Sequence, residues 1–238
     1  MSKLIEQVTA AQLRSGFSKR NYLVDKNWSN YNYWKYRVLR PIIKVRYKAF
    51  RKKNSPSPWL SPAATLFFDN WLTKDHIGVE FGSGLSTVFF AKRTKKMIVV
   101  EHFKPWYEKV VELFKKHAVE NVDYRFVAHQ KGDEIIPDPS LFEAYDFATQ
   151  NFEPRWDYLN YFTVLSDLEK ESIDFILVDG RARPECLFMS LDKLKSGGLM
   201  VLDNSERERY SIVFDHLKDW SSYTTSNGLT DTTFWQKP

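Results

Sequence analysis

Short apolar runs rich in β-branched and aromatic residues alternate with helical stretches between residues 61 and 203. The runs predict strands at 76–81, 96–101, 122–128, 173–178 and 199–202. The other stretches predict helices at 63–71, 86–93, 104–117, 158–170 and 184–194, with a turn at 196–198. Continuously apolar strands joined by helices are typical of a parallel sheet covered on both faces. Near the C-terminus, Asn227-Gly228 between threonine-rich runs predicts an antiparallel hairpin. We therefore expect a doubly wound, mostly parallel α/β sheet with an antiparallel C-terminal hairpin.

Charge divides the chain into two parts. Residues 1–60 hold 14 lysines and arginines against two acids, a net charge of +12, whereas the rest of the chain has a net charge of −7. The stretch 54–62, rich in proline and serine, lies at this change and is typical of a domain boundary. The prediction is a basic, aromatic-rich helical extension over 1–60 and one α/β domain over 61–238. The apolar content of 43% is enough for the core of that domain.

The single cysteine, Cys186, excludes an internal disulfide framework and fits a reducing compartment. No apolar run approaches the roughly 18 residues that span a bilayer. The first residues also lack the continuous apolar segment of a secretory signal. We expect a cytoplasmic protein, with a peripheral position at the inner membrane surface as the alternative.

The first predicted strand of the sheet leads into a glycine loop with the sequence Glu80-Phe-Gly82-Ser83-Gly84-Leu-Ser86-Thr87. In doubly wound folds the ligand lies at the carboxyl ends of the strands. A nicotinamide fingerprint would need a third glycine where this chain has Thr87, and a phosphate-binding P-loop would need Gly-Lys followed by serine or threonine. The loop therefore suits neither ligand, and the simplest alternative is an ordinary strand-to-helix turn.

With its acid ahead of the glycines, this loop resembles the first motif of class I S-adenosylmethionine-dependent methyltransferases. The resemblance implies a Rossmann-like fold over about residues 60–238 and S-adenosyl-L-methionine as the cofactor. It further implies that Glu80 anchors the methionine end, and that Gly82 and Gly84 let the backbone approach the ligand. Glu101, at the end of the second strand, would accept hydrogen bonds from the ribose hydroxyls, because a carboxylate has only acceptor sites. The remaining residues of the implied cofactor site are Ser83, Ser86, Thr87 and His102.

The ends of the fourth and fifth strands are partly similar to those of metal-dependent O-methyltransferases. Asp179 ends the fourth strand, and Asp203-Asn204 ends the fifth. These oxygen donors suit Mg²⁺ or another divalent cation, which would lower the pKa of an acceptor hydroxyl. The alternative is a polar floor without a metal, in which Asp179 ends a strand and Asp203-Asn204 caps a helix. Among the metal-dependent O-methyltransferases, those of the catechol type carry a lysine as the general base at the position where this chain has Ala182. That departure leaves three candidates for the general base: Asp179, His129 and Glu206.

Residues near these strand ends predict the kind of acceptor. Arg181, Arg183 and Asn204 would bind an anionic or multiply hydroxylated acceptor, because arginine keeps its charge. The aromatic residues Trp156, Tyr158 and Tyr161 would either form a wall for a sugar ring or pack in the core. The sequence Asp179-Gly-Arg-Ala differs from the Asn/Asp-Pro-Pro-Tyr/Phe motif of enzymes that methylate base amines. We expect O-methylation of a hydroxyl on a sugar, a glycan or a small molecule.

The extension carries two neighbouring stripes at helical spacing. One is cationic, at positions 37, 40, 44, 48 and 51, and the other is apolar, at Trp34, Val38, Ile42, Val45 and Ala49, with Pro41 as an expected kink or break. Such a helix can pack over the acidic domain or in a homodimer, lie on an anionic membrane, or contact nucleic-acid phosphates. Two alternative functions follow from it: an RNA ribose methyltransferase guided by the extension, or a non-catalytic membrane-surface or scaffold protein that retains the fold.

Overall fold

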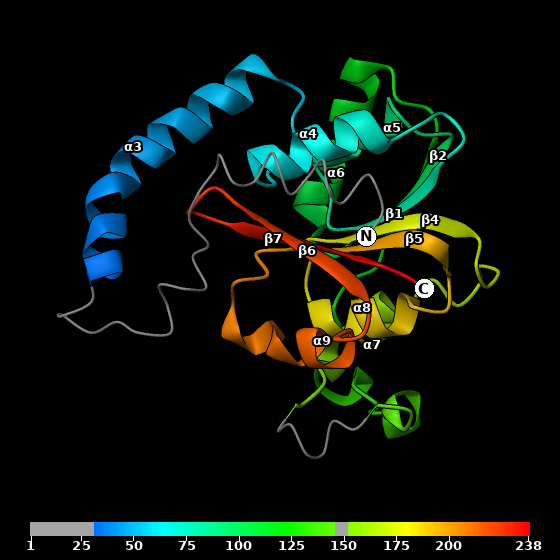
Figure 1. Ribbon diagram of the computed structural model, residues 1–238. Coiled ribbons are helices and arrows are strands. Elements are labelled where there is room, and N and C mark those ends of the chain that lie inside the picture. Colours follow the sequence, from blue (N-terminus) through cyan, green and yellow to red (C-terminus); the bar gives the residue numbers. More distant parts are fainter. Residues whose placement is uncertain (1–30, 146–151) are drawn as a thin grey trace.

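The computed structural model describes residues 31–145 and 152–238, and a seven-stranded sheet forms its centre (Figure 1). The strand order is β3-β2-β1-β4-β5-β7-β6. The strands are β1 (Ile77–Phe81), β2 (Lys96–Glu101), β3 (Val122–Phe126), β4 (Ile173–Val178), β5 (Leu194–Asp203), β6 (Ser221–Ser226) and β7 (Asp231–Gln236). The first five strands pair in parallel, whereas β7 is antiparallel to both β5 and β6. The predicted sheet and C-terminal hairpin are confirmed.

Helices cover both faces of this sheet, with α4, α5 and α6 on one side and α7, α8 and α9 on the other (Figure 1). Their bounds are α4 (Pro62–Trp71), α5 (Leu85–Ala91), α6 (Lys104–His117), α7 (Leu159–Phe162), α8 (Arg183–Ser190) and α9 (Ser211–His216). Two buried apolar clusters lie on the two faces, one including Phe68 and Phe90 and the other including Tyr161 and Trp235. The central strands are buried on both faces, which explains why β4 is almost continuously apolar.

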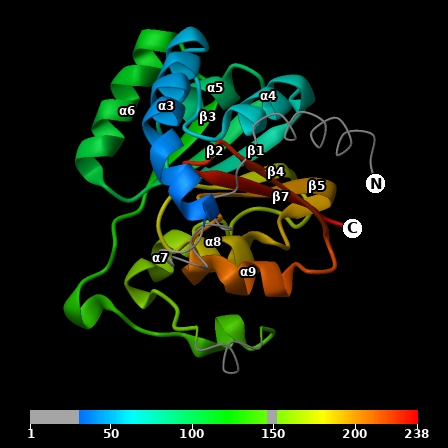
Figure 2. The ribbon, with the colours of Figure 1, turned by 60° about the vertical axis from the view of Figure 1, so that its left-hand side comes forward.

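Short 3₁₀ turns lie in the connections between these elements. They are η1 (Gly132–Glu134), η2 (Pro139–Phe142), η4 (Trp156–Tyr158) and η5 (Glu208–Tyr210). The described part of the connection from β3 to α7 extends outward below α7 and α8 (Figure 2).

The helix predicted over 158–170 is wrong beyond residue 162, where α7 ends. Arg125 of β3 explains this early end, because its guanidinium donates a hydrogen bond of 3.0 Å to the backbone carbonyl of Val164 and pairs with Asp167. These contacts hold the chain in turns where a helix would continue. The turn predicted at 196–198 lies inside β5, as an irregularity between the pairs Ile173–Leu194 and Phe175–Leu199.

The basic extension contains a long helix, α3 (Tyr31–Lys53), which projects from the side of the sheet (Figures 1 and 2). The helix continues through Pro41, so the break is wrong, whereas the kink that was its alternative stays a prediction. The expected boundary at residue 60 lies in the segment between α3 and α4. That segment is not a loose linker, because Ser61 is buried and its hydroxyl lies 2.6 Å from that of Thr225 in β6. None of the helices in the ranges 31–145 and 152–238 is long and apolar enough to cross a membrane.

Gly78 in β1 leaves room for a neighbouring aromatic ring. A Cβ atom at this position would lie 2.3 Å from ring atoms of Phe175 and 2.8 Å from the sulfur of Met97. We expect Gly78→Ala to lower the free energy of unfolding by about 1–3 kcal/mol, because the core is overpacked. Urea denaturation measures this loss.

The double variant Gly78→Ala/Phe175→Leu tests the cause. If the ring is the obstacle, the double variant will be more stable than the sum of the two single effects predicts. Strict additivity would show that the glycine is required for some other reason.

Candidate functional site

A cavity of about 900 Å³ lies at the carboxyl edge of the parallel strands, within the usual size range of ligand sites. It is formed by the loops that follow β1, β2, β4 and β5, together with part of the connection before α7. Its lining among the described residues is Gly82, Ser83, Glu101, His102, Phe103, Trp106, Phe152, Glu153, Arg155, Asp179, Gly180, Arg181, Ala182, Arg183, Pro184, Glu185, Arg207, Arg209, Tyr210, Ser211 and Ile212.

The loops after β1 and β4 touch through two glycines on the floor of this cavity. A Cβ atom on Gly82 would lie 3.1 Å from the backbone of Asp179 and Gly180, and one on Gly180 would lie 2.2 Å from the Tyr161 hydroxyl oxygen. Gly82 also has a φ of +95°, which favours glycine. The two loops therefore depend on the absence of side chains at Gly82 and Gly180. The predicted approach of a ligand to the backbone of Gly82 and Gly84 is a different contact and stays a prediction.

Glu80 lies beneath the glycine loop and not in the cavity lining. It is buried, and its carboxylate accepts a hydrogen bond of 2.6 Å from the hydroxyl of Thr87. The same Thr87 oxygen accepts a bond of 3.1 Å from the amide of Gly84 at the start of α5. Burial raises the pKa of Glu80 to about 8. In this geometry Glu80 and Thr87 support the loop from below, and buried Ser86 is also absent from the lining.

Glu101, at the end of β2, lines the cavity beside Ser83. Its Oε1 accepts bonds of 2.9 Å from the amides of His102 and Phe103, and its Oε2 accepts one of 2.7 Å from the Ser83 hydroxyl. The Nδ1 atom of His102 also lies 3.0 Å from Oε1. Burial alone would raise the pKa of Glu101, but the hydrogen bonds from His102, Phe103 and Ser83 lower it below its usual value. Glu101 is therefore an ionised carboxylate held in one orientation.

Two exposed aromatic side chains, Phe103 and Trp106, stand next to this carboxylate. The indole nitrogen of Trp106 donates a bond of 2.9 Å to the backbone carbonyl of Ser83, which ties the start of α6 to the glycine loop. Exposed aromatic surface at a cavity is typical of a binding site. The sequence analysis did not select these residues, although they follow Glu101 within the first turn of α6.

Arg183 joins the ends of β4 and β5. Its guanidinium donates to the Gly180 carbonyl at 3.1 Å, to the Asp179 carbonyl at 2.9 Å, to Asp179 Oδ1 at 2.8 Å, and to the carbonyl of Asp203. Arg183 and Asp203 are both buried, whereas Asp179 is partly exposed to the cavity. The predicted role of Arg183 in binding the acceptor stays a prediction, since its guanidinium is paired with Asp179.

Burial raises the pKa of both carboxyl groups at these strand ends. The negative charge of Asp179 contributes to the rise in the pKa of Asp203. The charge of Arg183 opposes the shift in both groups. The Asp203 carboxyl also accepts a bond of 3.0 Å from Thr232 in β7. Asp203 is thus the fully buried member of the pair, and Asp179 is the carboxyl group that faces the cavity.

The oxygen donors considered for a metal are committed to other partners. Asn204 donates to Thr230 at 2.6 Å and accepts from Arg207 at 2.7 Å. The guanidinium of Arg183 donates to the Asp179 carboxylate and to the backbone carbonyl of Asp203, so it already supplies a positive charge between the two strand ends. The described part of the chain has no group of three or more histidine, cysteine or acidic side chains that could hold a metal ion. Asp179, Asp203 and Asn204 therefore do not fit a divalent cation, and the similarity to metal-dependent enzymes stays unconfirmed.

The three candidates for a general base do not meet at the cavity. Asp179 lines it, whereas His129 is exposed after β3 and Glu206 is buried against the C-terminal hairpin. Glu206 accepts a bond of 3.0 Å from the amide of Asp231. Arg181, in contrast, is exposed and lines the cavity.

The aromatic residues considered as a sugar wall lie in or near the core. Tyr161 is fully buried against Phe81, and Trp156 packs against Phe142. Neither these two residues nor Tyr158 is among the described residues that line the cavity.

Other polar residues at the cavity were missed from the sequence. Glu185, in the first turn of α8, is buried, and its Oε2 atom has no hydrogen-bond partner among the described residues. Burial raises the pKa of Glu185. Arg207 and Arg209 line the same side from the loop after β5. Only their position shortly after the end of a strand would have indicated them.

Comparison with known proteins identifies the fold. No protein-family model and no curated protein matches the chain. Among solved structures, a methyltransferase-like protein from Silicibacter pomeroyi is similar at 19% identity with a TM-score of 0.51, over 77% of this chain and 90% of that one. A precorrin 8w decarboxylase from Methanobacterium thermoautotrophicum is similar at 15% identity with a TM-score of 0.51, over 78% of this chain and 95% of that one. The expected Rossmann-like fold of class I methyltransferases is confirmed.

The raised pKa of Glu80 predicts a pH-dependent stability. The folded state keeps the proton up to about pH 8, whereas the unfolded chain loses it near pH 4.5. Below the unfolded pKa, Glu80 is protonated in both states, so its ionisation does not affect the free energy of unfolding. That free energy falls as the pH rises between these two values. We expect Glu80→Gln to remove this dependence. The Tm of the variant minus that of the wild type should therefore increase from about pH 5 to pH 8. Thermal denaturation across that pH range measures the difference, and a constant difference would contradict the assignment.

Proposed function

We propose that this protein is a methyltransferase that uses S-adenosyl-L-methionine. The observation that carries the proposal is the position of Glu101, which lines one cavity together with Gly82 and Ser83 of the glycine loop. An ionised carboxylate beside a loop without bulky side chains suits a ligand that has ribose hydroxyls and a positive charge. The fold shared with a methyltransferase-like protein supports the same assignment.

Two features favour this ligand over a dinucleotide. Thr87 replaces the third glycine of the nicotinamide fingerprint, and its side chain is fixed between Glu80 and the amide of Gly84. The amide of Gly84 is therefore not available as one of the backbone donors that would bind a pyrophosphate. The antiparallel strand β7 also lies between β5 and β6, unlike the six-stranded order of dinucleotide-binding folds.

The residues of the cavity divide into two sides. Glu101 would accept hydrogen bonds from the ribose, with Phe103 and Trp106 beside it as apolar surfaces for the base. When bound, S-adenosylmethionine supplies an electrophilic methyl group. Asp179 faces the cavity as a partly exposed carboxyl with a raised pKa, which suits it to accept a proton from an acceptor hydroxyl.

The acceptor side supports a hydroxylated and anionic compound. Arg181, Arg207 and Arg209 line it. We infer O-methylation of a sugar, a glycan or a small hydroxylated molecule, with Arg183 in place of a metal between the two strand ends. The presence of three arginines favours an acceptor that carries a carboxylate, sulfate or phosphate group.

Titration calorimetry with S-adenosylhomocysteine tests the cofactor. The wild type should bind it, and Glu101→Gln should bind about tenfold to a hundredfold more weakly, because a hydrogen bond to a charged group contributes about 1.5–3 kcal/mol. The glutamine keeps the shape of the side chain while removing its charge.

Glu112→Gln, an exposed glutamate of α6 outside the cavity, is the matched control and should leave the affinity unchanged. Because Glu101 also orders the amides that follow it, the Tm of each variant should be measured alongside. Absence of binding by a folded wild type, or tighter binding of NAD than of S-adenosylhomocysteine, would overturn the proposal.

Transfer of a labelled methyl group to a panel of hydroxylated compounds tests the acceptor. For an anionic acceptor that is methylated, we expect Arg181→Gln to raise KM about tenfold or more with little change in kcat, because the charge binds a part of the acceptor away from the reacting oxygen. Lys116→Gln, which removes an exposed charge outside the cavity, is the control. Preference for neutral acceptors, or an unchanged KM, would contradict the anionic class.

A further inference from the structure

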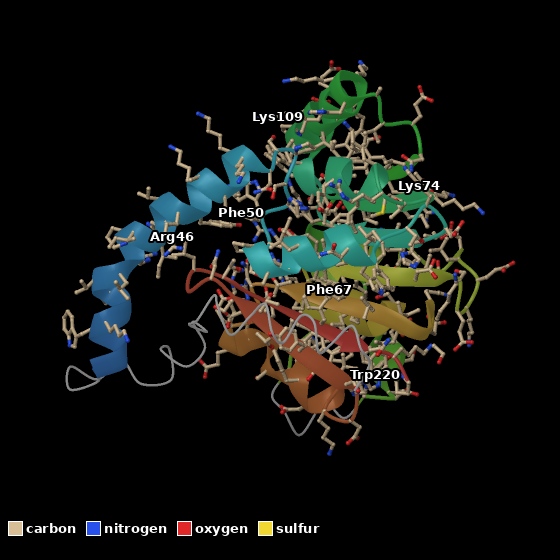
Figure 3. The ribbon with its side chains drawn as sticks, turned by 45° about the horizontal axis from the view of Figure 1, so that its top comes forward. Arg46, Phe50, Phe67, Lys74, Lys109 and Trp220 are labelled. Carbon is tan, nitrogen blue, oxygen red and sulfur yellow. The ribbon has the colours of Figure 1, made fainter. Side chains whose placement is uncertain are left out.

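The helix α3 carries two apolar rows, and only one of them faces the rest of the protein. Leu39, Ile43, Tyr47 and Phe50 are half-buried, and the Tyr47 hydroxyl donates a bond of 2.8 Å to the carbonyl of Leu60. Figure 3 shows Phe50 near the end of α3 that joins the body, with Arg46 farther out along the helix. This half-buried row differs from the apolar stripe that the sequence analysis selected.

The selected stripe is the row that faces solvent. Val38, Ile42 and Val45 are 71%, 57% and 69% exposed, with Trp34 at one end of the row and Ala49 at the other. Such a continuous row of exposed aliphatic side chains indicates a contact surface.

Cations border this row on both sides. At about 100° per residue, Lys35, Arg46 and Lys53 lie along one edge of the row, and Arg37, Lys44 and Lys48 lie along the other. All six are exposed, and α3 contains no aspartate or glutamate. The exposed face is thus an apolar strip between two positive margins.

We propose that this face of α3 binds an anionic phospholipid surface. Apolar side chains of an interfacial helix enter the boundary between headgroups and acyl chains, while lysine and arginine at its margins reach the negative headgroups. Each cation near such a surface adds to the attraction. The exposed apolar row of α3 suits the boundary with the acyl chains, and its two cationic margins suit the headgroups.

Other occupants fit this face less well. If two copies of the chain met through this face, the cationic margins of one α3 would lie against the cationic margins of the other. Outside α3, the exposed large apolar residues of the described chain are Phe103 and Trp106, which both line the cavity at the start of α6, and Trp59, Leu66, Phe126 and Ile136, which belong to different segments. They offer no second row to receive the first. Nucleic-acid phosphates would engage the margins but leave the aliphatic row against a charged backbone.

Co-sedimentation of the full-length protein with vesicles tests the proposal, which does not depend on the proposed enzymatic function. The protein should sediment with vesicles of phosphatidylcholine mixed with phosphatidylglycerol, and poorly with phosphatidylcholine alone. The apolar variant Val38→Ser/Ile42→Ser/Val45→Ser and the charge variant Lys44→Glu/Lys48→Glu should each partition about tenfold less onto the mixed vesicles.

Matched controls are Ile136→Ser, an aliphatic side chain that is 70% exposed, and Lys96→Glu/Lys116→Glu, which makes the same change of charge on β2 and α6. Both should bind as the wild type does. Since all substituted side chains are exposed, each variant should keep the Tm of the wild type, and this is checked first.

Several outcomes would overturn the proposal. One is a wild type that does not sediment with the anionic vesicles. Another is loss of binding in the charge variant alone, which would indicate a purely electrostatic contact. Conversion of a dimer to a monomer by the apolar variant would assign the face to a second copy of the chain. Tighter binding to single-stranded RNA than to vesicles, lost only in the charge variant, would assign it to nucleic acid.

Discussion

The contact between the Gly82 and Gly180 backbones is the constraint on which the cavity depends. Parallel strands bring their carboxyl ends to one edge of the sheet, but the loops that follow meet only where no side chain stands between them. Gly82 supplies the left-handed turn after β1, and Gly180 accommodates the Tyr161 hydroxyl beneath it. Because this floor is made of backbone, the carboxylates of Glu101 and Asp179 border a common space.

The sequence predicted the order of strands and helices well, because continuous apolar runs mark buried parallel strands. It predicted the site less well, because position at the end of a strand does not determine the direction of a side chain. Glu101 turns toward the cavity, whereas Glu80, one residue before the end of β1, turns beneath its own loop. His129 and Glu206 also follow strands, but His129 is exposed outside the cavity lining and Glu206 is buried elsewhere. Glu206, for example, bonds to the hairpin residue Asp231, 25 positions later in the chain.

The extension shows a related limit of sequence patterns. Periodicity identified an apolar stripe on α3, but the helix has two such rows, and the weaker pattern of Leu39, Ile43, Tyr47 and Phe50 is the one that faces the body. Tyr47 explains this choice in part, since its hydroxyl reaches the Leu60 carbonyl in the segment that leads to α4. Burial and the negative charges of Asp203 and Asp179 raise the pKa of Tyr47, so this side of α3 is within electrostatic reach of the cavity. Tertiary contacts of this kind are not encoded in the spacing of one helix.

Arg183 has a consequence for how the strand ends are assembled. Its guanidinium is attached to the chain and keeps its proton at any physiological pH, so the counter-charge of Asp179 is present as soon as the protein has folded. A dissociable ion in that position would make occupancy depend on cellular supply, and it could be exchanged for a competing ion of the same valence. The tethered arginine therefore gives Asp179 a counter-charge that does not dissociate from the chain.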